Sequence, residues 1–141
     1  MGDAGVAVTE GLFRMEGDGS LTLLGGRSAS SGLTHFPIGE VCPYSGAADV
    51  EPVDLPRSGT LWAWTEVTTA PPGYSGPVPY GLGVVEFDTG RGTLLRVIGR
   101  LVGLDASAAA HGVVMSAVAD EFDDDSGTTV LTWAFAPEGH P

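Results

Sequence analysis

The chain contains no lysine and a single cysteine, Cys42, and each of these shortages excludes a class of protein. Its six arginines stand against 18 aspartates and glutamates, which gives a formal net charge of −12 at pH 7. A surface this negative repels a phosphate backbone, so the sequence predicts no nucleic-acid partner. One cysteine excludes an internal disulfide and argues against a secreted scaffold held together by disulfides.

Long apolar runs are missing as well. No window approaches the roughly 18 consecutive apolar residues that a membrane-spanning helix needs. Residues 1–10 carry two acids and no basic residue, whereas a secretory signal peptide begins with a positive stretch. We therefore expect a cytoplasmic protein with no membrane partner, in which Cys42 is reduced.

Glycine (22 residues) and proline (10 residues) are abundant in this chain of 141 residues, which is enough for one ordinary domain. Turns should be frequent and long helices absent. Period, composition and bounding turns predict five strands. They cover residues 59–70, 80–87, 93–102, 113–122 and 128–136. The Ala-rich segment 105–110, with Asp105 as N-cap and Gly112 at its end, predicts one or two helical turns.

This order of elements, with a short helix between the third and fourth strands, is that of an OB-fold, a small Greek-key barrel. A five-stranded sandwich fragment is the alternative. In the first strand, strict alternation would place Thr60, Trp62 and Trp64 on one face. The first 58 residues are interrupted by Gly and Ser, so we expect an arm or small subdomain at 1–58 and the barrel at 59–141.

Candidate chemical groups are few. Cys42 and His35 lie near each other in sequence, but a zinc site needs four ligands and a catalytic cysteine needs a base and an orienting group. A small, partly buried residue in a turn is the simpler interpretation of Cys42. His111 fits a capping role and His140 lies near the C-terminus. The acidic run at 123–125 lacks the spacing of an EF-hand loop and fits a solvated hairpin turn.

Two arginines and one loop carry the binding hypotheses. Arg96 and Arg100 lie four residues apart on one strand and face the same way, so they could hold a phosphate or carboxylate. The alternative is ion pairing with Glu86 or Asp88 across the hairpin. Trp62 and Trp64 are either core residues or part of a partner surface.

The loop at 71–80 has four prolines and two tyrosines, Tyr74 and Tyr80. Such a stiff loop with aromatic anchors is either a contact surface or a rigid connector.

An ordered series of short motifs resembles a family of zinc-ribbon plus OB-fold proteins, the "domain of unknown function 35" family. That family has Cys-x-x-Cys-Gly, an aromatic–proline pair, Cys-Pro-x-Cys and a strand starting Gly-Thr. A Pro-Gly-aromatic loop, a Pro-Tyr, a Gly before the fourth strand and a final Phe-x-Pro follow. The matching residues here begin with Ser28-Ala29-Ser30-Ser31-Gly32, Phe36-Pro37, Cys42-Pro43-Tyr44-Ser45 and Gly59-Thr60. They continue with Pro72-Gly73-Tyr74, Pro79-Tyr80, Gly112 and Phe135-Ala136-Pro137.

Three of the four ligand positions implied by this resemblance are serines: Ser28, Ser31 and Ser45, with only Cys42 retained. A serine hydroxyl is a poor zinc ligand at neutral pH. The resemblance therefore implies a degenerate, rubredoxin-like ribbon arm without metal or other cofactor. We expect it to rest on packing of Leu33, Phe36, Ile38 and Val41.

The resemblance also implies a function, because members of the family accompany thiolase-like enzymes of acyl-CoA metabolism. It implies a mainly β protein that acts as a non-catalytic accessory subunit, with a thiolase-like protein as partner and an acyl-CoA substrate at the shared interface. Tyr74, Tyr80, Arg96 and Arg100 are the candidate contacts. The alternatives are a stand-alone OB-fold module for single-stranded nucleic acid, which lacks the basic groove it needs, and a small enzyme acting through Cys42.

Overall fold

The computed structural model describes residues 6–7, 12–16, 21–72, 78–90, 93–104, 108–123 and 126–137. Ten strands lie in these segments. The five N-terminal ones are β1 (Val6–Ala7), β2 (Phe13–Met15), the longer β3 (Leu21–Ser28), β4 (Thr34–His35) and β5 (Val50–Asp54). The five C-terminal ones, all of them long, are β6 (Ser58–Val67), β7 (Tyr80–Asp88), β8 (Leu94–Leu101), β9 (Val114–Asp123) and β10 (Thr129–Pro137).

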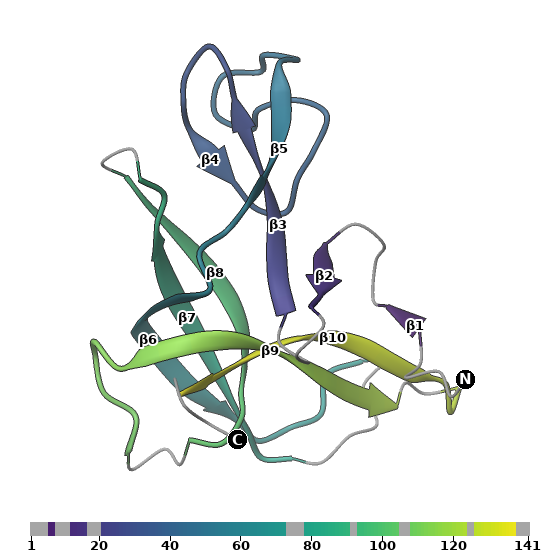
Figure 1. The fold of residues 1–141 in the computed structure, drawn as a ribbon. Coiled ribbons are helices and arrows are strands. Elements are labelled where there is room, and N and C mark those ends of the chain that lie inside the picture. The colour runs from purple at the N-terminus through teal and green to yellow at the C-terminus, as the bar shows by residue number, and fades with distance from the viewer. Residues whose placement is uncertain are drawn as a thin grey trace.

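The five long strands close into a barrel. Strand β7 pairs antiparallel with β6 and β8, β9 pairs antiparallel with β6 and β10, and β10 pairs parallel with β8. This closed circuit confirms the predicted OB-fold barrel. Figure 1 shows it below a small lobe built from β3, β4 and β5, with β1 alongside β10. None of the described residues forms a helix long and apolar enough to cross a membrane.

All five predicted barrel strands are present, with ends shifted by a few residues at most. The predicted short helix is not confirmed. Asp105 to Ser107 lie outside the described residues, and the residues described on either side contain no α-helix. Instead, Gly112, at φ 96°, donates its amide to Leu61 O at 2.8 Å and leads the chain into β9.

A β-bulge in β6 makes the predicted alternation wrong. Leu61 pairs with Val85 but Ala63 pairs with Val84, so the register shifts by one residue at Trp62. Thr60 and Trp64 consequently lie on opposite faces of the sheet, because an inserted residue reverses the side-chain phase beyond it. Trp62 and Trp64 are 39% and 40% exposed, so neither is a core residue.

The core fills the barrel and extends into the N-terminal part. Its largest barrel side chains at 0% exposure are Leu61, Val85, Phe87, Met115 and Phe135. Leu21, Leu23 and Leu55 join the same cluster. Interior glycines make room for it: a Cβ on Gly99 would lie 2.8 Å from the Phe135 ring.

The small lobe rests on the barrel through an aromatic contact and a hydrogen bond. The rings of Phe36 and Trp133 meet edge to face at 5.3 Å, and the Arg27 guanidinium donates to Thr89 O at 2.9 Å. Val41, expected to pack in this lobe, is 50% exposed, so that part of the prediction is wrong. The side chain of the next residue, Cys42, is 1% exposed and points into the lobe, which leaves Val41 on the outer side of the turn.

Candidate functional site

A cavity of about 310 Å³ lies where β6 and β8 end and β7 begins. Its lining combines apolar, aromatic and charged side chains, and consists of Trp64, Thr65, Glu66, Pro79, Tyr80, Gly81, Arg100, Leu101, Leu104 and Ala109. Tyr80 and Arg100, both predicted from the sequence as contact residues, therefore meet in one place. The volume is at the lower end of the range of about 300–1,000 Å³ typical of small-molecule pockets.

Arg100 lies near an aromatic ring and a carboxylate in this cavity. Its guanidinium carbon is 4.9 Å from the centroid of the Tyr80 ring, and its Nε is 3.4 Å from Oδ2 of Asp120 on β9. Only 19% of the Arg100 side chain and 17% of the Asp120 side chain is exposed. A guanidinium fixed in this way presents N–H donors in a set orientation, which suits a carboxylate or a phosphate.

Arg96 has a different environment on the same strand. Leu94, Arg96 and Ile98 are exposed and alternate with buried neighbours, which confirms that Arg96 and Arg100 face the same side. The Nε of Arg96 donates to Glu86 at 2.8 Å, and its guanidinium carbon lies 3.7 Å from the centroid of the Trp62 ring. The predicted ion pair across the hairpin is therefore confirmed for Arg96. For Arg100 the predicted partners, Glu86 and Asp88, were wrong. Its ion-pair partner is Asp120 on β9, whose side chain reaches Arg100 across β10.

Tyr74, the remaining predicted contact, lies outside the described residues, as do the other residues of the segment 73–77 in the loop at 71–80. The described end of this loop, Pro79 and Tyr80, lines the cavity.

Two turns of the small lobe have matching geometry. The amide of Gly32 donates to Ser28 O at 2.8 Å, and the amide of Gly46 donates to Cys42 O at the same distance. Both glycines have positive φ, 72° and 77°, which a residue with a side chain rarely adopts. The Ser28-x-x-Ser31-Gly and Cys42-x-x-Ser45-Gly segments therefore form turns with the same hydrogen bond and the same glycine conformation.

The side chains of these turns are joined by hydroxyl and thiol groups. Cys42 is 1% exposed, and hydrogen bonds, first from Ser45 and more weakly from Ser31, hold the pKa of its thiol below the ordinary value against the opposing effect of burial. The Ser28 hydroxyl donates to Asp49 Oδ1 at 2.7 Å, and the Ser30 amide donates to Asp49 Oδ2 at 2.7 Å. Hydrogen bonds lower the pKa of the Asp49 carboxyl, first that from the Ser28 side chain, then that from the Ser30 side chain, and less strongly that from the Ser30 amide.

Histidine and acid side chains do not assemble around Cys42. Among the described residues, no group of three or more His, Cys, Asp or Glu side chains is placed to hold a metal ion. His35 on β4 is 4% exposed, and neither of its ring nitrogens has a hydrogen-bond partner in the part of the chain described. Its ring lies over Gly26 of β3, where an added Cβ would come within 2.7 Å of Nε2.

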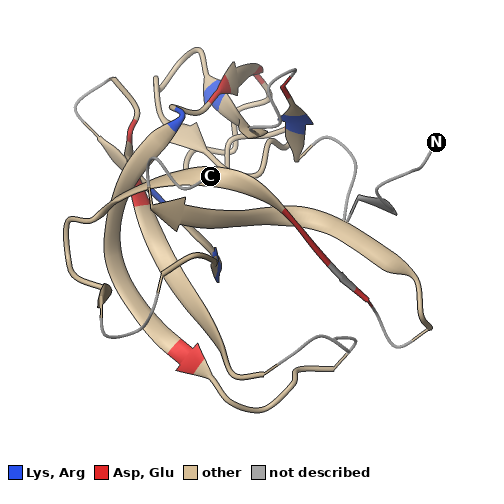
Figure 2. Cartoon of the chain, turned by 60° about the horizontal axis from the view of Figure 1, so that its bottom comes forward, with Lys and Arg blue, Asp and Glu red and all other residues tan. Residues whose placement is uncertain are grey.

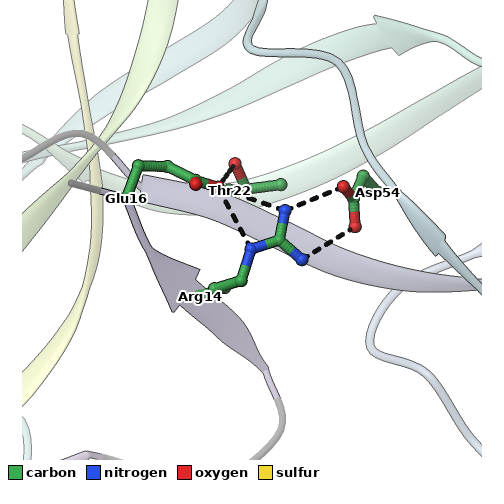
Figure 3. A network of polar contacts seen from close by, with 4 residues as sticks. All are labelled: Arg14, Glu16, Thr22 and Asp54. Carbon is green, nitrogen blue, oxygen red and sulfur yellow. Dashed lines mark hydrogen bonds and ion pairs between the residues drawn. The ribbon is translucent and has the colours of Figure 1, made fainter. Parts of the chain in front are cut away.

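A polar network ties β2 to the long strand β3 and to β5 (Figure 3). Arg14 contacts both oxygens of Asp54, at 3.3 and 2.8 Å, and donates its Nε to Glu16 at 3.2 Å. The Thr22 hydroxyl donates to the same Glu16 oxygen at 2.5 Å. The network lowers the pKa of Asp54, chiefly through the Arg14 hydrogen bond, and it fixes the arm rather than forming a binding site.

Charges are sparse over the barrel ribbon, as Figure 2 shows, and acidic residues gather near the end of β9. That stretch includes Asp120, Glu121 and Asp123. The positive groups of Arg96 and Arg100 therefore lie in an otherwise negative molecule, each next to an acid.

Comparison with known proteins bears on this barrel and its cavity. Residues 52–120 match the family described as "ChsH2, C-terminal OB-fold domain". A DUF35 domain-containing scaffold protein of Methanocaldococcus jannaschii is 25% identical over 114 residues, which cover 80% of this chain and 78% of the relative. A chain of the solved Ltp2-ChsH2(DUF35) aldolase is 26% identical with a TM-score of 0.57, over 82% of this chain and 84% of that one. All three findings support the OB-fold family resemblance found in the sequence.

Sequence reasoning missed Asp120 and the stacking of Arg96 on Trp62. Alternation along β9 predicts on which side of the sheet Asp120 lies. Its contact with Arg100 depends on the parallel pairing of β10 with β8, and that pairing has no local sequence signal. The Trp62 contact depends on the bulge in β6. A bulge of this kind leaves little trace in composition, because Trp62 is flanked by ordinary strand residues.

Proposed function

We propose that this chain is a non-catalytic accessory subunit of a thiolase-superfamily complex acting on acyl-CoA esters. The partner enzyme is a thiolase, an acyltransferase or a retro-aldolase. The observation that carries the proposal is the likeness to a chain of the Ltp2-ChsH2(DUF35) aldolase over more than four fifths of both chains. The similarity to a scaffold protein over 80% of the chain supports the same role.

The chemistry of the cavity supports a binding role. Its described lining includes one carboxylate, Glu66, and one guanidinium, Arg100, next to the aromatic surfaces of Trp64 and Tyr80. These groups can bind and orient an ester or an anion, but a carboxylate and a guanidinium do not make an activated nucleophile with its base. We propose Tyr74, Tyr80, Arg96 and Arg100 as contacts to the partner or to the CoA ester at the shared interface.

The proposal includes a small lobe that works without zinc. Hydroxyl groups stand at three of the four positions where the resembling family has thiolates, and Ser28 is instead hydrogen-bonded to Asp49. That bond and the paired turns supply the cross-link that a metal ion supplies in a zinc ribbon. A cytoplasmic location also belongs to the proposal, and fractionation of the host cells tests it.

The test is affinity purification of the tagged chain from its native host, followed by mass spectrometry. We expect a thiolase-superfamily protein in stoichiometric amount, and acyl-CoA turnover by the complex but not by the isolated chain. Recovery of the chain without such a protein would contradict the proposal. So would robust thioester turnover by the chain alone that disappears in Cys42→Ala.

A further inference from the structure

The outer side of strands β6, β7 and β8 carries six exposed or half-buried apolar side chains. They are Trp62, Ala63, Leu82, Val84, Leu94 and Ile98, called here the outer apolar face. Val84 lies opposite both Ala63 and Ile98, and Leu94 lies further along β8, opposite Asp88. Trp62, Leu94 and Ile98 are 39%, 61% and 55% exposed. A contiguous exposed apolar patch of this kind marks an interaction site in a soluble protein.

A hollow in this face points to a protein as its occupant. The hollow has a volume of about 210 Å³ and is lined by Ala63, Trp64, Thr65, Leu82, Gly83, Val84 and Ile98. It is smaller than the roughly 300–1,000 Å³ of small-molecule pockets. Its lining has no charged side chain, so it suits one apolar side chain of a partner better than a free polar ligand.

Another part of the outer apolar face, beside the hollow, has the composition of an interface hot spot. Arg96 lies 3.7 Å over the Trp62 ring and is held there by Glu86 at 2.8 Å. Tryptophan and arginine are the residue types that contribute most to binding when a partner covers them. Because the ion pair already fixes the guanidinium on the ring, docking would cost little further side-chain ordering.

Charge identifies the kind of partner. The exposed acid Asp88 lies at one end of this face, opposite Leu94, in a chain of net charge −12. A second copy would bring two surfaces of the same negative sign together. A different chain, with an apolar side chain surrounded by arginines or lysines, would instead be attracted by this negative charge.

We infer that the outer apolar face is the surface on which the enzyme subunit docks, and this inference rests on the proposed function. The hollow takes an apolar side chain of that subunit, and Trp62 and Arg96 form the binding hot spot. The hollow and the Tyr80–Arg100 cavity share Trp64 and Thr65 in their linings. A subunit seated on the face therefore borders the cavity.

The test uses the complex of the full chain with the thiolase-superfamily protein recovered from the host, and measures Kd by calorimetry. Trp62→Ala and Ile98→Arg should each raise Kd at least about tenfold. Val41→Arg and Tyr44→Ala are the matched controls, since these exposed apolar residues lie on the small lobe. They should leave Kd within about twofold of the wild type. Thermal melts check folding, and Ile98→Arg is the safer variant because its side chain is largely in water.

Three other outcomes would contradict this inference, and each can be told apart from the others. If the wild type binds and the face variants bind equally well, the docking surface lies elsewhere and the proposed function stands. If the isolated chain sediments as a dimer that Ile98→Arg dissociates, a second copy occupies the face. If no thiolase-superfamily protein is recovered, the proposed function fails and the inference fails with it.

Discussion

Removing Asp120 tests whether the cavity depends on a buried charge pair. At 3.4 Å from Oδ2 of Asp120, the Arg100 guanidinium is attracted by about 5 kcal/mol at an effective dielectric constant of 20. Desolvation of two groups that are each less than one fifth exposed offsets much of this attraction. In Asp120→Ala, Arg100 is still desolvated but no longer has the negative charge that offsets the cost of its desolvation. Its contact with the Tyr80 ring is unchanged by this substitution.

We therefore expect Asp120→Ala to lower the free energy of unfolding by about 1–3 kcal/mol, less than the roughly 3–5 kcal/mol found for fully buried pairs. The melting temperature should fall by about 3 °C per kcal/mol in a chain of this size. A double-mutant cycle with Arg100→Met should give a coupling of about 1–3 kcal/mol by urea denaturation. The more exposed Arg96 is the matched control, and Arg96→Met should cost about 1 kcal/mol or less. A coupling near zero would refute the argument, because it would mean that the two charges are solvated independently.

Four further results are expected. Asp54→Asn should destabilise the chain at neutral pH, because Arg14 lowers the pKa of the Asp54 carboxyl in the folded state. This stabilisation is present above the unfolded pKa of about 3.9 and is lost as the pH falls through the folded pKa. The melting temperatures of the wild type and the variant should therefore converge in acid. Elemental analysis should find no stoichiometric zinc, and one zinc per chain would mean that other groups join Cys42 as ligands. Single-stranded DNA should show no shift at micromolar protein and physiological salt, whereas a clear salt-sensitive shift would favour the nucleic-acid module. Tyr74→Ala should weaken complex formation by about 1–3 kcal/mol with little change in melting temperature. If the variant still co-purifies with the partner but is strongly destabilised, the loop has a structural role and the docking surface lies elsewhere.

The barrel could be predicted from the sequence because its strands carry strong local signals. Alternation in 94–101 and aromatic and β-branched residues in 58–67 mark strands whatever their partners are. The order of the elements then narrowed the topology to an OB-fold, which the closed circuit of pairings confirms.

The site was harder to predict because its geometry depends on contacts distant in sequence. Tyr80 and Arg100 could be named as candidates, yet their meeting in one cavity depends on the antiparallel pairing of β7 and β8. The exposure of Trp62 depends on a single inserted residue in β6. The matching geometry of the two small-lobe turns was not predicted, because serines carry no zinc-ligand signal of their own.

Strand β3 packs on the barrel core at its beginning and forms part of the small lobe at its end, and this bears on how the molecule opens. Leu21 and Leu23 at its beginning lie in the barrel core, while Ser28 at its end anchors the paired turns through Asp49 (Figure 1). A single continuous strand cannot leave one part without disturbing the other, so the two parts form one cooperative unit. Amide protons along all of β3 should then exchange only through global unfolding, and the small lobe should show no separate low-energy opening of its own.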